Sequence, residues 1–523
     1  MPKKNKTMTT VLVVMDGWGI GNPNDSGNPI KPVNAPHYFE WLKKYPHTEL
    51  KASGVDVGLF KGEEGNSEAG HINLGAGRIV KQDALYISDA IADGTFFKNN
   101  AFHQALHHIK KYKTAAHLLG LLSNHNSAHS CPEHIYALLD LFHKEGIKKV
   151  YLHLFTDGRD SGQHDAPQHL DKLKKHFHGN ERIVSMMGRY YAMDRGKNWE
   201  NIAKAYETIV LGKSRHIVKT AEEALAQAYN REETDEFIYP TQITNGDKKQ
   251  IPMTVKDNDA IFFFNLRSDR ARELTKVFAQ KNFEKMNPSA FKRKSFPQNT
   301  RFVAMTDFGP DLPGVLTAFP SRDIHNSLVQ VLCPKKQLFI SENEKFAHVT
   351  YFFNGGYTKH FCAERRVKID SEMIKNYATC PEMQIKAVAG YVIKAVKSGE
   401  YDFILVNFPN PDMVGHTGDF SAGKVAVQAV DREVAKLIDA MEKNNGQGII
   451  TADHGNVEEM INKKTGEIDT EHSTNPVPCI LVGRNFKNKK IKMKKGRLAD
   501  VAPTILKMMN MKKPREMTGT SLF

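Results

Sequence analysis

The chain has 523 residues, of which 40% are hydrophobic and 25% charged, and its formal net charge is +14. This length exceeds what one hydrophobic core supports and predicts two or three domains, and the composition is typical of a soluble globular protein. The positive charge suits small anionic substrates as well as nucleic acid. The sequence contains no basic stripe interleaved with aromatic residues and no usual nucleic-acid-binding module, which argues against nucleic acid.

Predicted strands and helices alternate from the start of the chain. A β-branched run at 10–15 predicts a buried strand that ends at Asp16. The elements expected next are a helix at 37–44, helical structure over 83–113, a strand at 115–122, a helix at 131–145, strands at 148–155 and 182–187, helices at 199–212 and 220–230, and a strand at 259–264. Residues 284–300 are rich in Lys, Pro, Asn and Ser and are expected to form a boundary or linker.

The last third of the chain shows the same alternation. The elements expected here are strands at 337–340 and 347–353, a helix from about Pro381 to Ser398, a strand at 402–408, a helix at 421–444, strands at 448–452 and 478–482, and a last helix from Asp500. Strands that alternate with helices predict an α/β fold, in which helices cover the faces of a mostly parallel sheet.

A glycine-rich stretch at 65–78 (GNSEAGHINLGAGR) surrounds Ser67. If a helix begins there, Ser67 lies near its N-terminus, where free backbone N–H groups favour an anion, and this suits a serine that attacks or carries a phosphate. The alternative is a serine that caps the helix on a glycine turn, and for the stretch taken alone this alternative is favoured. His71 is assigned a structural role.

Polar side chains follow six predicted strands at the point where each strand ends. They are Asp16, Arg159 with Asp160, Arg189, Arg267 with Arg270, Asp412 with His416, and Asp453 with His454. Open α/β sheets bind ligands at the carboxyl ends of their strands. The placement predicts two active-site rims that face each other, one bearing carboxylates and histidines and the other bearing arginines.

The first rim has the residue types of a metal site, and its members are Asp16, Asp412, His416, Asp453, His454 and His472. Asp412 and His416 are spaced for one helical turn, and Asp453 and His454 are adjacent. Mixed oxygen and nitrogen ligands suit manganese, zinc or cobalt better than calcium. Two such ions clamp an in-line phosphoryl transfer and lower the pKa of a serine hydroxyl such as that of Ser67. The alternative for any single pair is a surface carboxylate or a hydrogen-bonded histidine.

The second rim contains Arg159, Arg189, Arg195, Arg267 and Arg270. Arginine binds carboxylate and phosphate in a planar fork, although salt bridges on helix faces are the alternative. Asp160 and Asp194 lie beside these arginines, where a carboxylate orients or deprotonates a substrate hydroxyl or simply pairs with an arginine. Spacing alone leaves His129 undecided between a substrate contact and a solvated loop residue. Lys345, between two predicted strands, is expected to reach a phosphate as a point charge.

The cysteines and the absence of a membrane segment indicate a cytoplasmic protein. Cys131, Cys333, Cys362, Cys380 and Cys479 are scattered and odd in number. No two have metal-ligand spacing, which excludes a zinc ribbon, and a disulfide framework is not expected, which points to a reducing compartment. The sequence has no apolar run long enough to span a bilayer and no signal peptide.

Nine motifs together resemble a known family. They are DGWG at 16–19, GNSEAGHINLGAGR at 65–78, TDGRD at 156–160, GRYYAMDR at 188–195, RSDRAR at 267–272, SENEKFAHVTYFFNGG at 341–356, NPDMVGHTG at 410–418, TADHGN at 451–456 and HSTNPVP at 472–478. In this order the set closely resembles cofactor-independent (2,3-bisphosphoglycerate-independent) phosphoglycerate mutases, of the alkaline phosphatase superfamily.

The resemblance implies an α/β fold of two domains. One is a discontinuous, metal-binding, alkaline-phosphatase-like domain over 1–80 and 318–523, with helices on both faces of a mostly parallel sheet. The other is an inserted α/β phosphotransferase domain over 82–315. The implied reaction is the interconversion of 3-phosphoglycerate and 2-phosphoglycerate in glycolysis and gluconeogenesis, through a phosphoserine, in a monomer that needs no nucleic acid, membrane or bisphosphoglycerate.

The resemblance also assigns roles residue by residue. Ser67 is the nucleophile; Asp412, His416 and His472 hold one metal; Asp16, Ser67, Asp453 and His454 hold the other; His129, Arg159, Asp160, Arg189 and Arg195 hold the glycerate; Arg267, Arg270 and Lys345 hold the phosphate. The metals are usually Mn²⁺, and sometimes Mg²⁺, Zn²⁺ or Co²⁺. Asp160 is expected to take the proton from the attacking substrate hydroxyl.

The loop at 123–130 departs from the family pattern, and two alternative functions stay open. The loop is less glycine-rich than usual, and Cys131 stands where the family usually has a histidine. The first alternative is a metal-dependent phosphatase or a pentose-phosphate mutase on the same scaffold. The second is a metal-dependent polyanion-binding protein without turnover.

Overall fold

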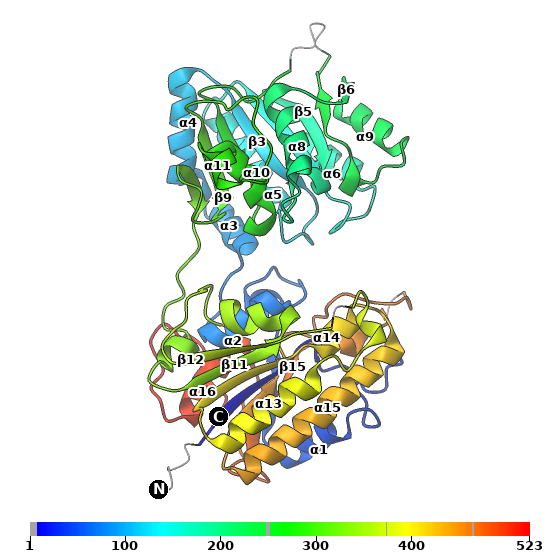
Figure 1. Cartoon of the computed structure of the whole chain (residues 1–523), viewed down its shortest axis with the longest axis vertical. Helices are drawn as coiled ribbons and strands as arrows, with labels where there is room; N and C mark the ends of the chain where they lie inside the picture. Colours follow the sequence, from blue (N-terminus) through cyan, green and yellow to red (C-terminus); the bar gives the residue numbers. More distant parts are fainter. Residues whose placement is uncertain (1–7, 247–251, 373, 463–464) are drawn as a thin grey trace. The chain divides into compact units, whose positions relative to one another are not determined.

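The computed structural model describes residues 8–246, 252–372, 374–462 and 465–523. The chain forms two compact units (Figure 1): unit 1 comprises the residues up to Gln82 and from Asp323 onward, and unit 2 comprises Asp83–Arg322. Each unit contains one eight-stranded, mostly parallel sheet, so the predicted α/β class is confirmed. The segment 284–300 is a connection inside unit 2 rather than a boundary, because the two strands that follow it join the sheet of unit 2.

The sheet of unit 1 has the strand order β12-β11-β13-β1-β14-β15-β2-β16. Its strands are β1 (Thr10–Met15), β2 (His47–Lys51), β11 (Gln337–Glu342), β12 (Glu364–Ile369), β13 (Phe403–Phe408), β14 (Gln447–Thr451), β15 (Val477–Gly483) and β16 (Gly496–Arg497). β1 pairs in parallel with both β13 and β14, and every residue of β1 is buried. A parallel strand covered on both faces is apolar throughout, which explains the uninterrupted run at the start of the chain.

Helices cover the sheet of unit 1 on both sides (Figure 1). They are α1 (Pro36–Lys44), α2 (Ser67–Ala76), α12 (Leu328–Val331), α13 (Ile385–Ser398), α14 (Asn410–Gly415), α15 (Phe420–Lys443) and α16 (Val501–Met508), with the short turns η1 (Gly54–Val57), η4 (Asn343–Lys345), η5 (His348–Phe352), η6 (Tyr377–Thr379), η7 (Val457–Glu459) and η8 (Leu498–Asp500). α13 packs against α15 and the sheet, and α2 packs against α16 and η5.

The strand predicted at 347–353 is wrong, since η5 is a π-helix. The segment HVTYFF is rich in β-branched and aromatic residues, which favours a strand by composition. Its buried residues are Val349, Thr350 and Phe353, and this spacing places them on one face of a helix rather than on alternate sides of a strand.

The sheet of unit 2 has the order β10-β9-β8-β3-β4-β5-β7-β6. Its strands are β3 (Ala116–Leu122), β4 (Val150–Thr156), β5 (Glu181–Gly188), β6 (His216–Val218), β7 (Thr241–Ile243), β8 (Ala260–Phe263), β9 (Arg301–Thr306) and β10 (Val315–Phe319). Its helices and turns are α3 (Asp83–Ala92), η2 (Phe96–Lys98), α4 (Asn100–Tyr112), α5 (Pro132–Lys144), α6 (Ala166–Lys174), α7 (Arg189–Ala192), α8 (Trp199–Leu211), α9 (Ala221–Tyr229), η3 (Asp235–Phe237), α10 (Ser268–Ala279) and α11 (Phe283–Met286).

Both faces of this second sheet are packed with aromatic side chains. Phe262 contacts Phe102 of α4 and Phe142 of α5, whereas its neighbour Phe263 belongs to the core formed with α8 and α10. Successive side chains of a strand point to opposite faces of the sheet, so Phe262 and Phe263 of β8 each pack into the core on a different face.

One disulfide corrects the expectation drawn from the scattered cysteines. Cys333 and Cys362 are bonded, and their Cα atoms lie 5.3 Å apart. The physical reason is strand register: Gln337 of β11 lies opposite Glu364 of β12, so the residues just before each strand meet at the same edge of the sheet. In the part of the chain that the structure describes, no helix combines the length and apolar character that crossing a membrane requires.

Candidate active site

The N-terminus of α2 presents Ser67 without using it as a cap. The cap is Asn66, whose side-chain oxygen accepts a hydrogen bond from the backbone N–H of Ala69 at 2.9 Å. The capping alternative for Ser67 is therefore wrong, because Ser67 is the first residue of the helix. Gly70 lets α2 lie against the end of β14, since a Cβ atom there would be 2.7 Å from the Cβ of Asp453.

The hydroxyl of Ser67 lies at the centre of a buried polar cluster. Its Oγ is 2.9 Å from Nε2 of His454 and 3.4 Å from Oδ1 of Asp16. Lys345 Nζ donates to the same oxygen at 2.5 Å. A hydrogen bond from an ammonium group stabilises the negative charge that forms on a serine oxygen when the hydroxyl loses its proton. These contacts therefore suit a nucleophile.

Lys345 joins the carboxylates that the sequence predicted as ligands. Its Nζ donates to Oδ1 of Asp16 at 2.9 Å and to Oδ2 of Asp412 at 2.7 Å, and the side chain is buried. Burial alone lowers the pKa of Lys345, but the two carboxylates raise it above its ordinary value. Burial raises the pKa of Asp412, and Lys345 overcomes this and holds that pKa well below its usual range. The cluster therefore holds charged groups at neutral pH.

Three histidines direct the same ring nitrogen toward Asp412. In each, Nδ1 faces a backbone carbonyl oxygen: Thr470 at 2.8 Å for His416, Gly65 at 2.8 Å for His472, and Gly455 at 3.2 Å for His454. Their Nε2 atoms lie 3.4, 3.2 and 3.8 Å from Oδ1 of Asp412, in the same order. A carbonyl on Nδ1 fixes the N–H there and leaves the Nε2 lone pair for a metal.

The protonation of these histidines differs although they share one carboxylate. Burial lowers the pKa of His454, but the carboxylates of Asp453 and Asp16 raise it to about 9. Burial and the neighbouring His454 lower the pKa of His472. Burial lowers the pKa of His416, but the Asp412 carboxylate raises it above its ordinary value. The Nε2 atoms of His416 and His472 are 3.1 Å apart, close enough for both to contact one cation.

The residues present fit two divalent ions. The ligand atoms of Asp412, His454 and His472 all lie within 4.8 Å of one another, and so do those of Asp16, Asp453 and His454. Oδ2 of Asp453 is buried, and its neighbours are two ring nitrogens, Nδ1 of His71 at 3.2 Å and Nε2 of His454 at 3.5 Å. Carboxylate oxygens with imidazole nitrogens form a donor set for manganese, zinc or cobalt.

His71, assigned a structural role from the sequence, lies against the side chain of Asp453 and the backbone of Ser67. Its Nδ1 is 3.2 Å from Oδ2 of Asp453 and 2.9 Å from the carbonyl oxygen of Ser67. Its Nε2 is 3.1 Å from the amide of Asn407, and that amide donates to Oδ2 of Asp16 at 2.7 Å. His71 follows Ser67 by one helical turn, which is a usable signal, whereas nothing in the sequence marks Asn407, a residue inside β13.

In unit 2, a buried arginine holds the carboxylate of Asp160. Nη1 of Arg189 donates to Oδ1 of Asp157 at 2.5 Å and to Oδ2 of Asp160 at 2.8 Å, and Ser127 Oγ donates to Oδ2 of Asp160 at 2.7 Å. Burial raises the pKa of Asp160, but these hydrogen bonds lower it below its ordinary value. Asp160 is therefore ionised at neutral pH. Sequence reasoning missed Asp157, which anchors Arg189 from the end of β4.

The remaining predicted residues of unit 2 surround this pair. Burial and the charge of Arg189 lower the pKa of His129 to about 4, so its ring is neutral. Arg195 donates to Asp269 at 2.9 Å, and Arg267 lies 3.9 Å from the same carboxylate. Arg270 donates to the carbonyl of Met193 at 3.2 Å, and Arg159 is exposed, 3.7 Å from Glu236.

The structure thus separates the predicted residues into two groups, one in each unit. Asp16, Ser67, Lys345, Asp412, His416, Asp453, His454 and His472 meet in unit 1, and His129, Arg159, Asp160, Arg189, Arg195, Arg267 and Arg270 belong to unit 2. Lys345, which the resemblance assigns to the phosphate together with Arg267 and Arg270, lies beside Ser67 in unit 1. The first group suits attack on phosphorus, and the second, being rich in guanidinium groups, suits an anion with a hydroxyl.

Comparisons with known proteins agree with this chemistry. A family model described as the Metalloenzyme superfamily matches residues 8–513. The chain is 42% identical to the 2,3-bisphosphoglycerate-independent phosphoglycerate mutase of Acetivibrio thermocellus, with 99% of each chain covered, and 43% identical to that of Clostridium botulinum, with 98% of each covered. It is also similar to the crystal structure of Leishmania mexicana phosphoglycerate mutase at low cobalt concentration, with a TM-score of 0.76, 30% identity, and coverage of 100% of this chain and 98% of that one.

Proposed function

Because this chain belongs to the 2,3-bisphosphoglycerate-independent phosphoglycerate mutases, we propose that it interconverts 3-phosphoglycerate and 2-phosphoglycerate through a phosphoserine on Ser67. One observation carries the assignment of Ser67: its Oγ lies within 2.9 Å of both His454 Nε2 and Lys345 Nζ. The reaction is a step of glycolysis and gluconeogenesis and requires no bisphosphoglycerate.

The residues of unit 1 are proposed to hold two divalent ions. Asp412, His416 and His472 would hold one, and Asp16, Ser67, Asp453 and His454 the other; Mn²⁺ suits these ligands best, with Mg²⁺, Zn²⁺ and Co²⁺ as alternatives. When bound, the ions supply positive charge that favours the serine alkoxide and neutralises the phosphate. The support is the clustering of the ligand atoms of Asp16, Asp412, Asp453, His454 and His472. His416 lies 3.4 Å from Asp412, and Ser67 lies 2.9 Å from His454.

Metal affinity at this cluster is expected to rise with pH up to about 9. His454 must be neutral to bind a metal, and in the metal-free protein its pKa is raised to about 9, so the protonated form competes at pH 7. Each pH unit below about 9 weakens binding by up to about tenfold through this group. Calorimetric titration with Mn²⁺ at several pH values, in buffers of different ionisation enthalpy, measures both affinity and proton release. An affinity that does not change with pH would contradict the assignment.

The chain's own residues account for the first half of the reaction. Ser67 Oγ gives its proton to solvent and attacks phosphorus, while the bond between phosphorus and the substrate oxygen breaks and that oxygen takes up a proton as glycerate leaves. Lys345 donates to Oγ and, after attack, to the phosphate that Oγ carries, so its charge is used in both states. In the second half, the other hydroxyl of glycerate attacks the phosphoserine and regenerates Ser67.

The residues of unit 2 are proposed to retain the glycerate between the two halves. Arg189, Arg195, Arg267 and Arg270 supply guanidinium donors for its carboxylate and for the phosphate. Asp160, ionised and fixed by Arg189 and Ser127, accepts the hydrogen bond of the attacking hydroxyl and takes its proton. Neutral His129 provides a ring donor or acceptor without added charge.

Replacement of Asp160 by asparagine is expected to lower kcat by about 10²- to 10³-fold, because a positioned carboxylate base is lost while its shape remains. Steady-state assay of 2-phosphoglycerate formation measures this. Asp194→Asn is the matched control: the Asp194 carboxylate accepts from the backbone N–H groups of Gly196 and Asn198, and this variant should keep kcat within about threefold. Equal losses in the two variants would remove Asp160 from the mechanism.

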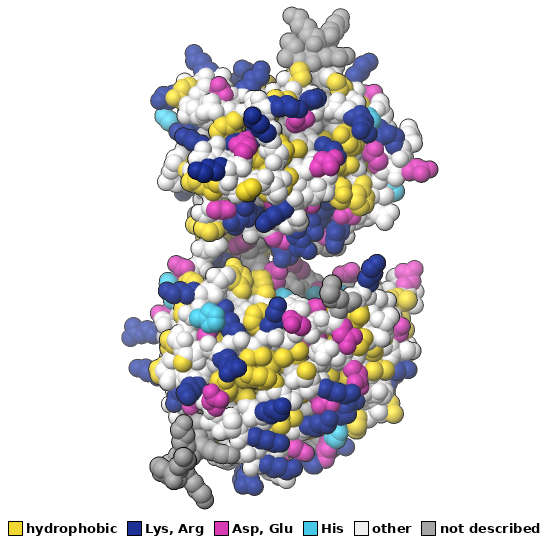
Figure 2. Space-filling view, in the orientation of Figure 1, with side chains coloured by type: hydrophobic (Ala, Val, Ile, Leu, Met, Phe, Trp, Pro, Cys, Tyr) yellow, Lys and Arg dark blue, Asp and Glu magenta, His cyan; other side chains and the backbone are white. Residues whose placement is uncertain are grey.

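A product assay separates the mutase from its alternatives. Incubation with 3-phosphoglycerate should yield 2-phosphoglycerate with little free phosphate, whereas a metal-dependent phosphatase releases mostly free phosphate. Ribose 1-phosphate tests the pentose-phosphate mutase. A polyanion-binding protein turns over none of these, and on the face seen in Figure 2 basic side chains are mixed with acidic and apolar ones, without the stripe that a nucleic acid requires.

We further propose that the enzyme acts as a monomer in the cytoplasm. The glycolytic substrate supports the location in the cytoplasm. The presence of every assigned residue in one chain supports the monomer. The Cys333–Cys362 pair tests this location, because a reducing cytoplasm keeps protein thiols reduced. Thiol alkylation in intact cells, followed by peptide mass spectrometry, shows whether this pair is oxidised where the enzyme works.

A further inference from the structure

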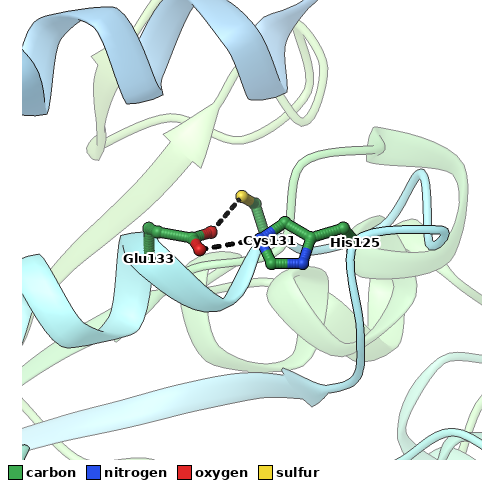
Figure 3. A group of neighbouring side chains, drawn as sticks. All are labelled: His125, Cys131 and Glu133. Carbon is green, nitrogen blue, oxygen red and sulfur yellow. Dashed lines mark hydrogen bonds and ion pairs between the residues drawn. The ribbon is translucent and has the colours of Figure 1, made fainter. Parts of the chain in front are cut away.

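A third polar cluster lies in unit 2, apart from the residues used above (Figure 3). Oε1 of Glu133 is 2.7 Å from Nε2 of His125, and Sγ of Cys131 donates to Oε2 of Glu133 at 3.0 Å. His125 lies in the loop after β3, Cys131 precedes the first residue of α5, and Glu133 is in the first turn of that helix. Imidazole, thiol and carboxylate therefore meet over nine residues of chain.

The three side chains have the geometry and chemistry of a transition-metal site. Their ligand atoms all lie within 4.8 Å of one another. Two ligands of a tetrahedral zinc ion, at bond lengths of about 2.0 to 2.3 Å, are about 3.5 Å apart, so small side-chain rotations would close the set around an ion. Thiolate with imidazole favours Zn²⁺ or Co²⁺, whereas Mn²⁺ and Mg²⁺ prefer oxygen.

The exposure of the cluster gives an ion a path to the thiol. Cys131 is buried, while the side chains of His125 and Glu133 are 59% and 47% exposed. Glu133 contacts both His125 and the buried sulfur of Cys131, as Figure 3 shows, and so holds the two exposed side chains close to the thiol. An ion can enter from solvent between two movable ligands and reach a fixed third one.

An adjoining cavity supplies a second, independent observation. A cavity of about 260 Å³ is lined by His125 and Glu133 together with Tyr136, His169, Lys172 and His176. His169 is more than nine-tenths buried, and its Nε2 has no hydrogen-bond partner among the described residues. A buried ring nitrogen without a partner needs a ligand or water, and this one lines the same cavity as two members of the cluster.

We propose that His125, Cys131 and Glu133 bind a divalent transition metal of the zinc class, as a third ion separate from the pair at Ser67. Binding forms a bond from the Cys131 sulfur to the metal and releases the thiol proton to solvent, with no change of oxidation state. The ion would tie the loop after β3 to the start of α5. That loop carries Ser127, which donates a hydrogen bond to Asp160. The ion would therefore restrict the motion of a residue that positions Asp160 for the glycerate.

Cobalt spectroscopy of the full-length protein tests this site. Chelated protein is first supplied with Mn²⁺ to fill the pair at Ser67, and is then titrated with Co²⁺ under anaerobic conditions. A thiolate-to-cobalt charge-transfer band in the near-ultraviolet is expected as Co²⁺ is added, and Co²⁺ that displaces Mn²⁺ from the pair at Ser67 does not contribute to it, because the ligands of that pair include no thiolate. Added Zn²⁺ should remove the band, and added Mn²⁺ should not.

Matched variants locate the band. Cys131→Ser should abolish it, and Cys380→Ser, which removes the half-buried free thiol of unit 1, should leave it unchanged. His125→Ala and Glu133→Gln alter exposed side chains, so they keep the fold, and each should weaken Co²⁺ binding at least about tenfold. The absence of a band in the unaltered protein, or a band of full intensity in Cys131→Ser, would overturn the proposal. Loss of the band in Cys380→Ser would do the same.

Discussion

Replacing Ser67 with alanine is expected to lower kcat by about 10⁴-fold or more, the largest loss of any single substitution in this chain, because no other hydroxyl among the described residues takes its place between Lys345 and His454. Substrate binding to unit 2 should be retained, since its arginines are untouched. Acid-quenched samples of the unaltered protein should contain a phosphopeptide spanning Ser67, and samples of the variant should not.

Asn66→Ala is the matched control for this substitution. It removes the helix cap one residue earlier and is expected to cost about 1 kcal/mol of unfolding free energy, but it leaves the hydroxyl in place. If Ser67 matters only for the structure of α2, the two variants will lose activity together. A phosphopeptide that excludes Ser67 would refute the phosphoserine assignment directly.

Replacing Lys345 with methionine is expected to lower kcat by about 10²- to 10³-fold without weakening metal binding. Lys345 supplies a proton donor to Ser67 and is not a metal ligand, so its loss leaves the carboxylates free for the ions. In the metal-free protein the same change should cost about 3 to 5 kcal/mol of unfolding free energy, because Asp16 and Asp412 remain buried without their cation. Added Mn²⁺ should restore most of this stability.

Lys487→Met provides the comparison with an exposed ion pair. Lys487 donates to Glu442 at 2.8 Å on the surface, and its loss should change the unfolding free energy by less than about 1 kcal/mol and leave kcat unchanged. Chemical denaturation with and without Mn²⁺, together with calorimetric titration, measures both effects. A Lys345→Met variant that loses metal affinity in parallel with kcat would show that Lys345 organises the metal ligands rather than the serine.

The fold was predictable where burial leaves a simple pattern. The apolar run of β1 predicts a strand, because a parallel strand with helices on both faces is apolar throughout. The amphipathic run of α15 predicts a helix, because a helix that packs on a sheet with one side is apolar on that side. η5 was not predictable in this way, since its composition favours a strand and only its packing makes it helical. The Cys333–Cys362 contact depends on the register of β11 and β12, which no local pattern encodes.

The candidate site was predictable in its membership but not in its contacts. Residue types at strand ends, together with the resemblance, identify Asp412 and His454. Lys345 could be assigned a charge but not its partners, because Asp16 and Asp412 lie 329 and 67 residues away in the chain. Asn407 gives no signal, since an amide inside a strand is recognisable as a support for Asp16 only when the neighbouring strand is known.

The position of β1 has a consequence for synthesis on the ribosome. β1 emerges from the ribosome long before its two sheet partners, which begin at Phe403 and Gln447. Unit 2 is continuous from Asp83 to Arg322, so it is complete and able to fold while β1 still lacks both neighbours. A nascent chain therefore carries an unpaired apolar strand until β13 and β14 have been made, and it acquires its catalytic cluster only after His472 has emerged. Chains truncated before Gln447 should aggregate and require chaperones, rather than persist as a partly active fragment.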